Sequence, residues 1–410
     1  MIEVVGIGLN PELLCGATCL AIADADVIVG GKRQLAAFPD AGGERIAITA
    51  PLGKVIDAIR ARSDEGRRVV VLADGDPLFY GIGRTLIETL GAESVRIHPG
   101  VTTLQTAAAR MGLPWQDIRV VSMHGRDDQA PLFAALTWYE RVAVFTDDEH
   151  TPGTIARSLL ERGATDYGMW VFEDLESPTE RIGLYSLEHA VQERFSPLNM
   201  AVLERRRKAP LPLRLGIPDE DLAHEGDMIT KWPVRAVGLA SLAIEPEDVV
   251  WDVGAGCGAV SIEAAVLASD GEVVAVERDE RRMEMLRENL RRTGAWSVLA
   301  VAGEAPDCLA GLPDPDRIFV GGGLGGGIGG GGSQGEEVLR ACCRRLKPGG
   351  RITAHAVLLD SLSRAQSVFA SLSWPTSIQQ VQVSQSEILG PGTRLRGQNP
   401  VFVISATRPA

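Results

Sequence analysis

The chain has 410 residues, of which 45% are hydrophobic and 23% charged, and its formal net charge is −13. This length predicts two domains, because single hydrophobic cores rarely grow beyond about 250–300 residues. The acidic balance argues against non-specific nucleic-acid binding through a global positive field. No apolar run is long enough for a membrane span and no basic segment precedes the first apolar run, so we expect a cytoplasmic protein without a signal peptide.

The first half alternates between strand and helix patterns, which is typical of an α/β fold with a parallel sheet. A short strand begins at Ile2, and a helix is expected from Pro11 with Asn10 as its N-cap. Further helices are expected at 54–62 and 105–111, the second capped by Thr102 or Thr103. Strands are expected at 27–30, 68–72, 117–122, 141–145, 166–172 and 199–203.

The apolar strand at 68–72 leads into a turn, 73–83, that contains two acids, a proline and three glycines. Open α/β sheets bind their ligands at the carboxyl ends of strands, which makes this turn a candidate binding loop. On the residues alone, an elaborate structural turn is an equally good interpretation.

A composition change marks the boundary between the two halves. Residues 209–218 contain three prolines and are typical of an extended linker, and the four cations at 205–208 are interpreted as a solvated strand end. We place the first domain at residues 1–204, the linker at 205–216 and the second domain at 217–410.

The second half is organised around a glycine-rich turn at 254–258, which follows an apolar strand and precedes an Ala-rich helix. Such a turn brings backbone N–H groups and a helix N-terminus to a nucleotide-like ligand. Glu277 ends the next strand, where an acid receives ribose hydroxyls. The spacing also fits a dinucleotide fingerprint. The acid before the turn, Asp252, favours S-adenosylmethionine, because a carboxylate repels a pyrophosphate and attracts an ammonium or sulfonium group.

The rest of the second half continues the α/β pattern. A helix is expected to open at 228–237, strands at 297–301, 317–320 and 351–357, and a helix at 338–346. The alternation at 378–383 and 401–404 predicts a closing antiparallel pair. Residues 321–335 contain eleven glycines and are interpreted as a tolerated surface insertion rather than a lid.

Cysteines and histidines give no sign of a metal site. The six cysteines lack C-x-x-C or zinc spacing and are expected to be buried apolar thiols, and the six histidines are dispersed.

The N-terminal half resembles the tetrapyrrole methylases. The resemblance is carried by 6–9, 75–79, 99–103 and 112–114. In that family S-adenosylmethionine lies in a cleft between two α/β lobes. The resemblance implies that the matching positions contact the cofactor: Leu9, Gly75, Asp76, Phe79, Thr102 and Thr103, with Asp74 in the same turn.

The C-terminal half resembles the decarboxylating precorrin methylases, which have a Rossmann-like class I methyltransferase fold. The resemblance is carried by 216–220, 228–231, 234–235 and 251–258. It implies cofactor contacts at Thr230, Gly254, Ala255, Gly256, Cys257, Gly258, Glu277 and Ala305. Three features depart from the family: Cys257 replaces Thr or Ser, His355 replaces Asn, and the glycine tract is longer than the family's loop.

In this order the halves resemble the fused methyltransferases of cobalamin biosynthesis. These methylate precorrin-6Y at C-5 and C-15 and decarboxylate the ring C acetate, which gives precorrin-8. The resemblance implies one S-adenosylmethionine per domain, a homo-oligomer, and no nucleic-acid or membrane partner.

No catalytic residue is assigned, because methyl transfer to an electron-rich carbon depends mainly on alignment and exclusion of water. His355 and Arg235 are hypotheses for a group that assists decarboxylation. Two other function classes stay open, a nicotinamide-dependent oxidoreductase and a ligand-sensing module that binds the cofactor without turnover.

Overall fold

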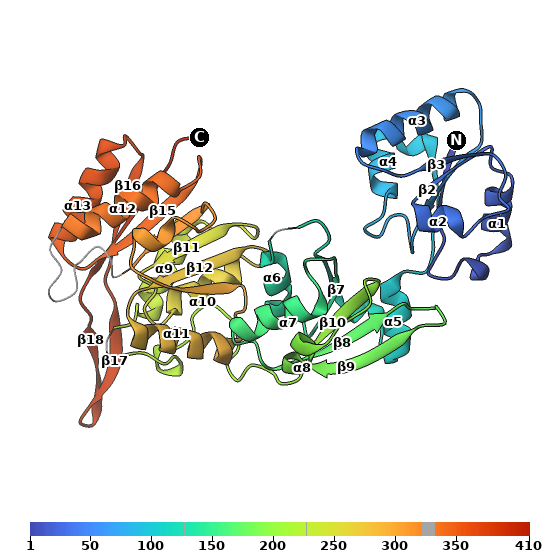
Figure 1. The fold of residues 1–410 in the computed structure, drawn as a ribbon. Helices are drawn as coiled ribbons and strands as arrows, with labels where there is room; N and C mark the ends of the chain where they lie inside the picture. Colours follow the sequence, from blue (N-terminus) through green and yellow to red (C-terminus); the bar gives the residue numbers. More distant parts are fainter. Residues whose placement is uncertain (127, 227, 322–332) are drawn as a thin grey trace. The chain divides into compact units, whose positions relative to one another are not determined.

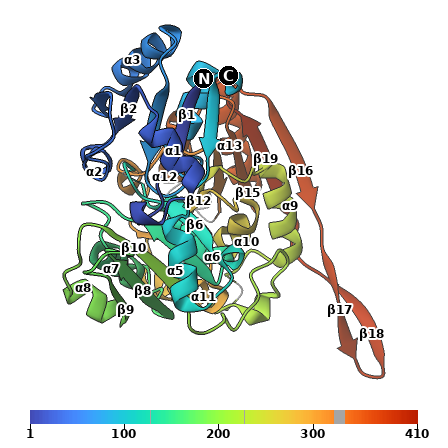
Figure 2. The ribbon, with the colours of Figure 1, turned by 90° about the vertical axis from the view of Figure 1, so that its right-hand side faces the viewer.

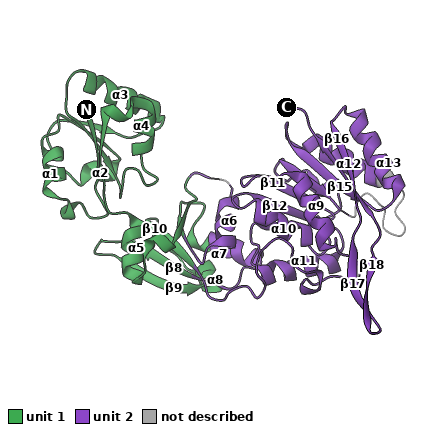
Figure 3. Cartoon of the chain, turned by 180° about the vertical axis from the view of Figure 1, so that it is seen from behind, with its two compact units in different colours: residues 1–124, 143–153, 169–203 green, residues 125–142, 154–168, 204–410 purple. Residues whose placement is uncertain are grey.

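The computed structural model describes residues 1–126, 128–226, 228–321 and 333–410. These residues form two compact units (Figure 3): unit 1 comprises 1–124, 143–153 and 169–203, and unit 2 comprises 125–142, 154–168 and 204–410. Most of the glycine tract, 322–332, lies outside the described residues, so the interpretation as an insertion stays a prediction. No helix in the described ranges is both long and apolar enough to cross a membrane.

Unit 1 begins with a parallel sheet whose strands run in the order β3-β2-β4-β1-β5 (Figure 1). The connections are helical, as parallel strands require. The strands are β1 (Ile2–Gly6), β2 (Val27–Gly30), β3 (Glu44–Ala47), β4 (Val69–Ala73) and β5 (Val95–His98). The helices are α1 (Gly16–Ala23), α2 (Lys32–Ala36), α3 (Leu52–Asp64) and α4 (Gly83–Leu90). All residues of β4 are buried, which explains its uninterrupted apolar sequence.

A second sheet follows in the order β6-β7-β10-β8-β9, and most of its residues belong to unit 1. Its strands are β6 (Arg119–Ser122), β7 (Arg141–Phe145), β8 (Tyr167–Glu173), β9 (Arg181–Ser186) and β10 (Asn199–Arg205). Helices α5 (Thr103–Met111) and α8 (Leu187–Gln192) also lie in unit 1, whereas α6 (Ala130–Trp138) and most of α7 (Pro152–Glu161) lie in unit 2. One apolar cluster joins α5 to strands of this sheet.

The main sheet of unit 2 has the order β13-β12-β11-β14-β15-β19-β16. The strands are β11 (Val249–Val253), β12 (Glu272–Glu277), β13 (Val298–Ala302), β14 (Arg317–Val320), β15 (Arg351–Ala356), β16 (Thr376–Val381) and β19 (Val401–Thr407). The helices are α9 (Trp232–Leu242), α10 (Ala259–Leu267), α11 (Glu280–Thr293), α12 (Ser333–Arg345) and α13 (Leu359–Ser371). Strands β11 to β15 are parallel, and β19 is antiparallel to both β15 and β16. The predicted closing antiparallel pair is therefore confirmed.

Two polar contacts connect the 125–168 segments of unit 2 to this sheet. The backbone N–H of Ser297 donates to Thr137 Oγ1 over 2.8 Å, and Arg162 Nη2 lies 3.0 Å from Glu272 Oε1. Both acceptors are largely buried, so the contacts are shielded from solvent.

A hairpin that the sequence analysis did not predict projects from the sheet of unit 2 (Figures 1 and 2). Its strands, β17 (Ser384–Leu389) and β18 (Gly392–Gly397), pair only with each other among the described strands. Every residue of β18 is exposed. Neither face of the hairpin packs on the core, so its sequence lacks the alternation of apolar and polar residues that usually marks a strand.

Two predicted helix starts need correction. Pro11–Leu13 forms only a 3-10 turn, although Asn10 Oδ1 accepts the N–H of Glu12 as expected of a cap, and α1 begins at Gly16. The helix expected from Met228 begins at Trp232, with Pro233 in its first turn. A proline is favoured in the first turn of a helix, where its missing N–H leaves no hydrogen bond unmade, so Pro233 is compatible with a helix start at Trp232 and not with a continuous helix from Met228. The other 3-10 turns are Ala92–Ser94, Trp115–Asp117, Asp219–Asp221 and Asp307–Leu309.

Candidate cofactor sites

In unit 1 the predicted cofactor residues lie on three loops that leave neighbouring parallel strands. The loops follow β1, β4 and β5, and β1 lies between the other two. Carboxyl ends of parallel strands meet at one edge of the sheet, so the loops meet there. Ile7 N–H donates to Ala73 O over 2.9 Å, and Gly75 N–H donates to Gly8 O over 3.1 Å. The structure therefore brings together the segments that the sequence analysis treated separately.

Three glycines allow these loops to pack backbone against backbone. A Cβ atom on Gly6 would lie 2.5 Å from Gly75 O and 2.7 Å from Gly100 N. A Cβ atom on Gly100 would clash with Gly75 O and would lie 2.8 Å from Gly6 O. No other residue type fits these two positions without displacing backbone, which is the physical reason for glycine there.

Asp76 connects two of the loops. Its Oδ1 accepts the N–H of Leu78 over 2.8 Å, and its Oδ2 accepts the N–H of Gly100 over 3.3 Å. Asp74 points elsewhere and pairs with Arg33 over 2.8 Å at the surface. Asp76 thus ties the loop after β4 to the loop after β5.

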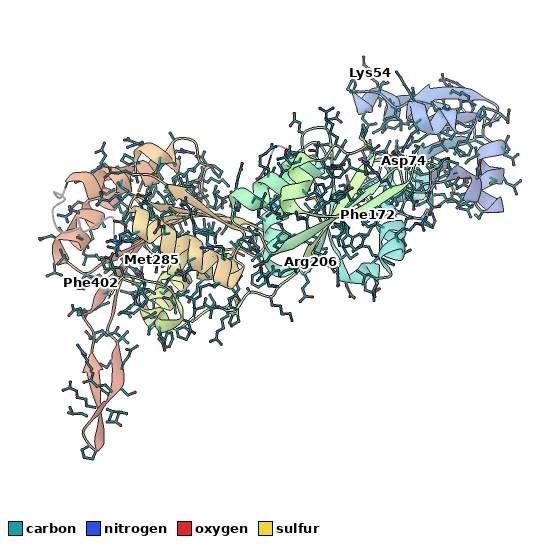
Figure 4. All side chains as sticks on the ribbon, turned by 60° about the horizontal axis from the view of Figure 1, so that its bottom comes forward. Lys54, Asp74, Phe172, Arg206, Met285 and Phe402 are labelled. Atoms are coloured by element: carbon teal, nitrogen blue, oxygen red, sulfur yellow. The ribbon has the colours of Figure 1, made fainter. Side chains whose placement is uncertain are left out.

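The remaining predicted residues of this site contribute to helix capping and packing. Thr102 is the N-cap of α5: its Oγ1 accepts the N–H of Gln105 over 3.1 Å, which confirms one of the two predicted caps. Thr103 is the first residue of the helix. Leu9 and Phe79 pack against the apolar cluster that includes Phe172 of β8 (labelled in Figure 4). Their roles as cofactor contacts stay predictions.

In unit 2 the glycine turn connects β11 to α10 in the predicted place. Gly254, Gly256 and Gly258 have φ values of +79°, +59° and +81°, which L-residues with side chains rarely adopt. Gly258 is the N-cap of α10. The N–H groups of Gly254 and Ala255 both donate to Val276 O over 2.9 Å, which fixes the turn against β12.

Glu277 has a role that the sequence analysis did not predict. Its carboxylate accepts the N–H groups of Gly256 (2.8 Å), Arg278 (2.9 Å) and Asp279 (2.9 Å), and the residue is only 5% exposed. These bonds tie the glycine turn to the start of α11. The predicted bond to ribose hydroxyls is not tested by this geometry.

Asp252 lies beneath the turn and is 1% exposed. Its Oδ2 accepts the hydroxyl of Ser261, whereas its Oδ1 is buried and has no hydrogen-bond partner within the described residues. Burial, opposed by the Ser261 hydrogen bond and assisted by the nearby Glu277 charge, raises the pKa of this carboxyl to about 7. The sequence analysis treated Asp252 as a negative charge, but near pH 7 a large share of this carboxyl is protonated and neutral.

A fully buried ion pair joins the helices around the turn. Arg235 Nη2 of α9 lies 2.8 Å from Glu263 Oε1 of α10, and neither side chain is exposed. The guanidinium also donates to Thr230 O and Ile217 O, each over 2.6 Å. The hypothesis that Arg235 assists decarboxylation receives no support, because the side chain is fully buried and its terminal nitrogens donate to groups of the protein. Arg235 positions the loop that carries Thr230.

Asn289 of α11 is a second positioning residue that the sequence analysis missed. It is fully buried, donates to Cys257 O over 2.9 Å and forms two hydrogen bonds with the backbone of Ala223. The sequence signal for this role is an asparagine at a position of α11 where the helical periodicity predicts an apolar residue.

A cavity of about 1480 Å³ opens beside the glycine turn. Five of the predicted cofactor residues line it: Thr230, Gly254, Ala255, Gly256 and Cys257. Its described wall does not include Gly258, Glu277 or Ala305. Gly258 caps α10, and Ala305 follows β13 and packs against the core. The predicted contacts thus divide into residues that face the cavity and residues that shape it.

His355 of β15 also lines this cavity. Its ring packs edge-to-face on Phe319, with centroids 4.7 Å apart, and its Nε2 is buried without a partner in the described chain. Burial lowers the pKa of this imidazole to about 4. The ring is therefore neutral near pH 7, and the hypothesis that a protonated His355 assists decarboxylation receives no support.

The cysteines do not all follow the expectation of buried thiols. Cys257, Cys342 and Cys343 are buried, and burial raises the pKa of each thiol. Cys15 and Cys19 of the first helical region are exposed, because α1 turns that side to solvent. No cluster of His, Cys, Asp or Glu suited to a metal occurs in the part of the chain that the structure describes.

Comparison with known proteins assigns a family to each half. Residues 1–190 match the tetrapyrrole (corrin/porphyrin) methylases, and residues 220–408 match the precorrin methyltransferase domain. A Mycobacterium tuberculosis protein named precorrin-6Y C(5,15)-methyltransferase (decarboxylating) is 34% identical over 420 residues, which cover 100% of both chains. The chain belongs to this family. Its members are C-methyltransferases that use S-adenosylmethionine, so both resemblances found in the sequence are confirmed.

Two shorter relatives each match less than half of the present chain. A cobalt-precorrin-7 C(5)-methyltransferase of Salmonella typhimurium is 43% identical over 183 residues, 44% of this chain and 89% of its own. A probable cobalt-precorrin-6B C(15)-methyltransferase (decarboxylating) of Pyrobaculum calidifontis is 37% identical over 194 residues, 47% of this chain and 95% of its own.

The loop packing in unit 1 predicts that Gly100→Ala destabilises the protein by about 1–3 kcal/mol, because the new Cβ atom has to displace backbone. Urea unfolding measures the change. Gly16→Ala is the matched control: nothing lies within 4 Å of its Cβ position at the start of α1, so it is expected to be neutral or slightly stabilising. Equal effects of the two substitutions would contradict the packing argument.

The buried ion pair predicts that Glu263→Gln destabilises unit 2 by about 2–3 kcal/mol, because Arg235 loses its fully buried counter-charge and keeps only the more exposed Asp219, 3.3 Å away. Glu336→Gln removes a half-exposed i,i+4 pair with Arg340 on α12 and is expected to change the free energy of unfolding by at most about 0.5 kcal/mol. A loss below about 1 kcal/mol for Glu263→Gln would show that the pair does not hold the helices.

The raised pKa of Asp252 predicts a specific pH dependence. The folded state binds the proton more tightly than the unfolded state, so this stabilising contribution is complete below about pH 4 and is lost as pH rises through about 7. Asp252→Asn keeps a partner for Ser261 and removes the titration. Relative to the variant, the wild type is expected to lose on the order of 2–4 kcal/mol between pH 4 and pH 8 in urea unfolding. Parallel pH profiles would refute the shift.

Proposed function

We propose that this protein methylates precorrin-6Y at C-5 and C-15 with S-adenosylmethionine and decarboxylates the ring C acetate, which gives precorrin-8 in cobalamin biosynthesis. The observation that carries the proposal is the end-to-end match to a relative named for both methylations and the decarboxylation. A single-reaction enzyme would match such a relative over only part of its length.

We propose further that the halves divide the work. The N-terminal domain, 1–204, would methylate C-5, and the C-terminal domain, 217–410, would methylate C-15 and decarboxylate, with 205–216 as the linker. Each domain would bind one S-adenosylmethionine. Two findings support this division: the two family matches fall on separate residues, and relatives named for a single methylation span nearly their own full length on less than half of this chain.

The cofactor contacts predicted from the sequence would form the two cofactor sites. In the N-terminal domain, the loops after β1, β4 and β5 would hold the cofactor against rigid backbone. In the C-terminal domain, the cofactor would lie on the glycine turn, where residues 254–257 and Ala259 at the start of α10 line the cavity. When bound, S-adenosylmethionine supplies an electrophilic methyl group, and the protein aligns it with a nucleophilic ring carbon and excludes water.

In this proposal, decarboxylation at the C-terminal site needs no proton donor from the described cavity wall. Loss of carbon dioxide from an acetate conjugated to a ring imine leaves an enamine, which directs electrons to the carbon that accepts the methyl group. The neutral His355 ring beside Phe319 gives this part of the cavity a weakly polar wall. A less hydrated carboxylate loses carbon dioxide more readily, because its charge disperses as the bond breaks.

A cytoplasmic location, a homo-oligomeric state and the absence of nucleic-acid and membrane partners complete the proposal. They rest on the acidic composition and on the resemblance stated above.

Cofactor stoichiometry tests the division of labour. Isothermal titration of the full chain with S-adenosylmethionine is expected to give two binding sites. Gly256→Val places a branched side chain at φ +59° and is expected to abolish one of them, together with carbon dioxide release from precorrin-6Y. Gly100→Ala is expected to weaken the other site, while carbon dioxide release persists. A single site in the wild type, or loss of both sites in one correctly folded variant, would contradict one cofactor per domain.

A further inference from the structure

The β17–β18 hairpin forms part of the wall of the cavity beside the glycine turn. It continues β16 and β19 beyond the sheet (Figures 1 and 2). At its base, Gln398 N–H donates to Val383 O over 2.8 Å, and Gln382 Nε2 donates to Gln398 O over 2.7 Å. The hairpin residues Gln385, Ser386, Glu387, Arg396 and Gly397 line the cavity. An element that contributes nothing to the apolar core therefore borders the proposed C-terminal active site.

The cavity is larger than a cofactor requires. Pockets that hold a single small ligand typically enclose about 300–1,000 Å³. This cavity of about 1480 Å³ has room for a second large ligand beside one that occupies the glycine turn. The part of the wall that the turn does not supply includes the hairpin, so the hairpin faces the space for the second ligand.

Of the two arginines of β18, Arg394 is hydrogen-bonded to Glu387 and Arg396 is not. Glu387 lies opposite Arg394 in the strand register, and Arg394 Nε and Nη2 both contact Glu387 Oε1. Arg396 Nη1 lies 3.6 Å from Glu387 Oε2, which is too long for a hydrogen bond. Within the described residues Arg396 makes no hydrogen bond, and its side chain is 75% exposed. Its donors are therefore available to a ligand.

Other groups of the wall favour an anionic ligand. Lys231 and Arg282 line the cavity together with Arg396. Three acids also line the cavity: Asp219 lies 3.3 Å from Arg235, Glu387 is paired with Arg394, and Glu220 stands on the Asp219–Asp221 turn, on a part of the wall that the hairpin does not supply. Gln385 lies directly opposite Arg396 in the hairpin and adds an amide donor.

We propose that Arg396 binds a carboxylate side chain of the tetrapyrrole, so that the hairpin is a substrate-recognition arm of the C-terminal domain. The inference rests on the proposed function, because a precorrin carries acetate and propionate groups around its ring. The planar fork of a guanidinium matches a carboxylate bidentately, which an ammonium does not. Arg396 would set substrate affinity without taking part in bond making or breaking.

Steady-state kinetics of carbon dioxide release from precorrin-6Y test the proposal on the full-length chain. Arg396→Gln is expected to raise KM for the tetrapyrrole about tenfold with kcat nearly unchanged, because a charge-assisted hydrogen-bond pair to the substrate is lost. The wild-type KM is expected to rise more steeply with salt than the variant's KM. Arg394→Lys is the control: it keeps a cation beside Glu387 and is expected to leave KM unchanged.

The outcomes separate this inference from the proposed function. Absence of carbon dioxide release in the wild type would overturn the proposed function. Normal wild-type activity with an unchanged KM in Arg396→Gln would overturn only the role of Arg396. Weaker binding of S-adenosylmethionine in Arg396→Gln, measured by titration, would instead assign Arg396 to the cofactor carboxylate. An equal rise in KM for Arg394→Lys would show a general effect of hairpin structure and would also overturn the proposal.

Discussion

The buried pair between Arg235 and Glu263 constrains the whole proposed C-terminal site. An unpaired charge in a dry interior is very unfavourable, so α9 and α10 fit together only when the guanidinium meets the carboxylate. The terminal nitrogens of Arg235 also donate to Thr230 O and Ile217 O. One interaction therefore fixes two helices, the segment before α9 and the loop that borders the cavity. Glu277 and Asn289 act in the same way on the turn itself.

The two proposed cofactor sites are built by different means. In unit 1, three loops pack backbone against backbone at Gly6, Gly75 and Gly100, and the site is an assembly of loop backbones. In unit 2, a single turn adopts left-handed dihedrals and is held by side chains from beneath. The first arrangement is sensitive to an added Cβ atom at Gly6 or Gly100, whereas the second depends on the buried Glu277 carboxylate. Both provide rigid placement, which is what methyl transfer between two bound molecules requires.

Much of the fold could be predicted because its signals are local. The apolar runs that became β4, β11 and β12 are buried on both faces, and such strands have a distinctive composition. Helix starts that depend on loops were less accurate, as Pro11 and Trp232 show. The β17–β18 hairpin was missed because it is exposed on both faces, so neither periodicity nor apolar content distinguishes it from a loop.

The sequence by itself determined the order of the two family resemblances, the glycine turn at 254–258, the turns around Gly75 and Thr102, and the family. Short contiguous motifs specify these features, because the backbone conformation of each depends on a few neighbouring residues. Only the tertiary structure decided that Arg235 is a positioning residue, that His355 is neutral, and that Asp252 is protonated more readily than a surface acid. It also decided that Arg396 borders the cavity. Burial and charge partners depend on residues distant in the sequence, so no local pattern specifies them.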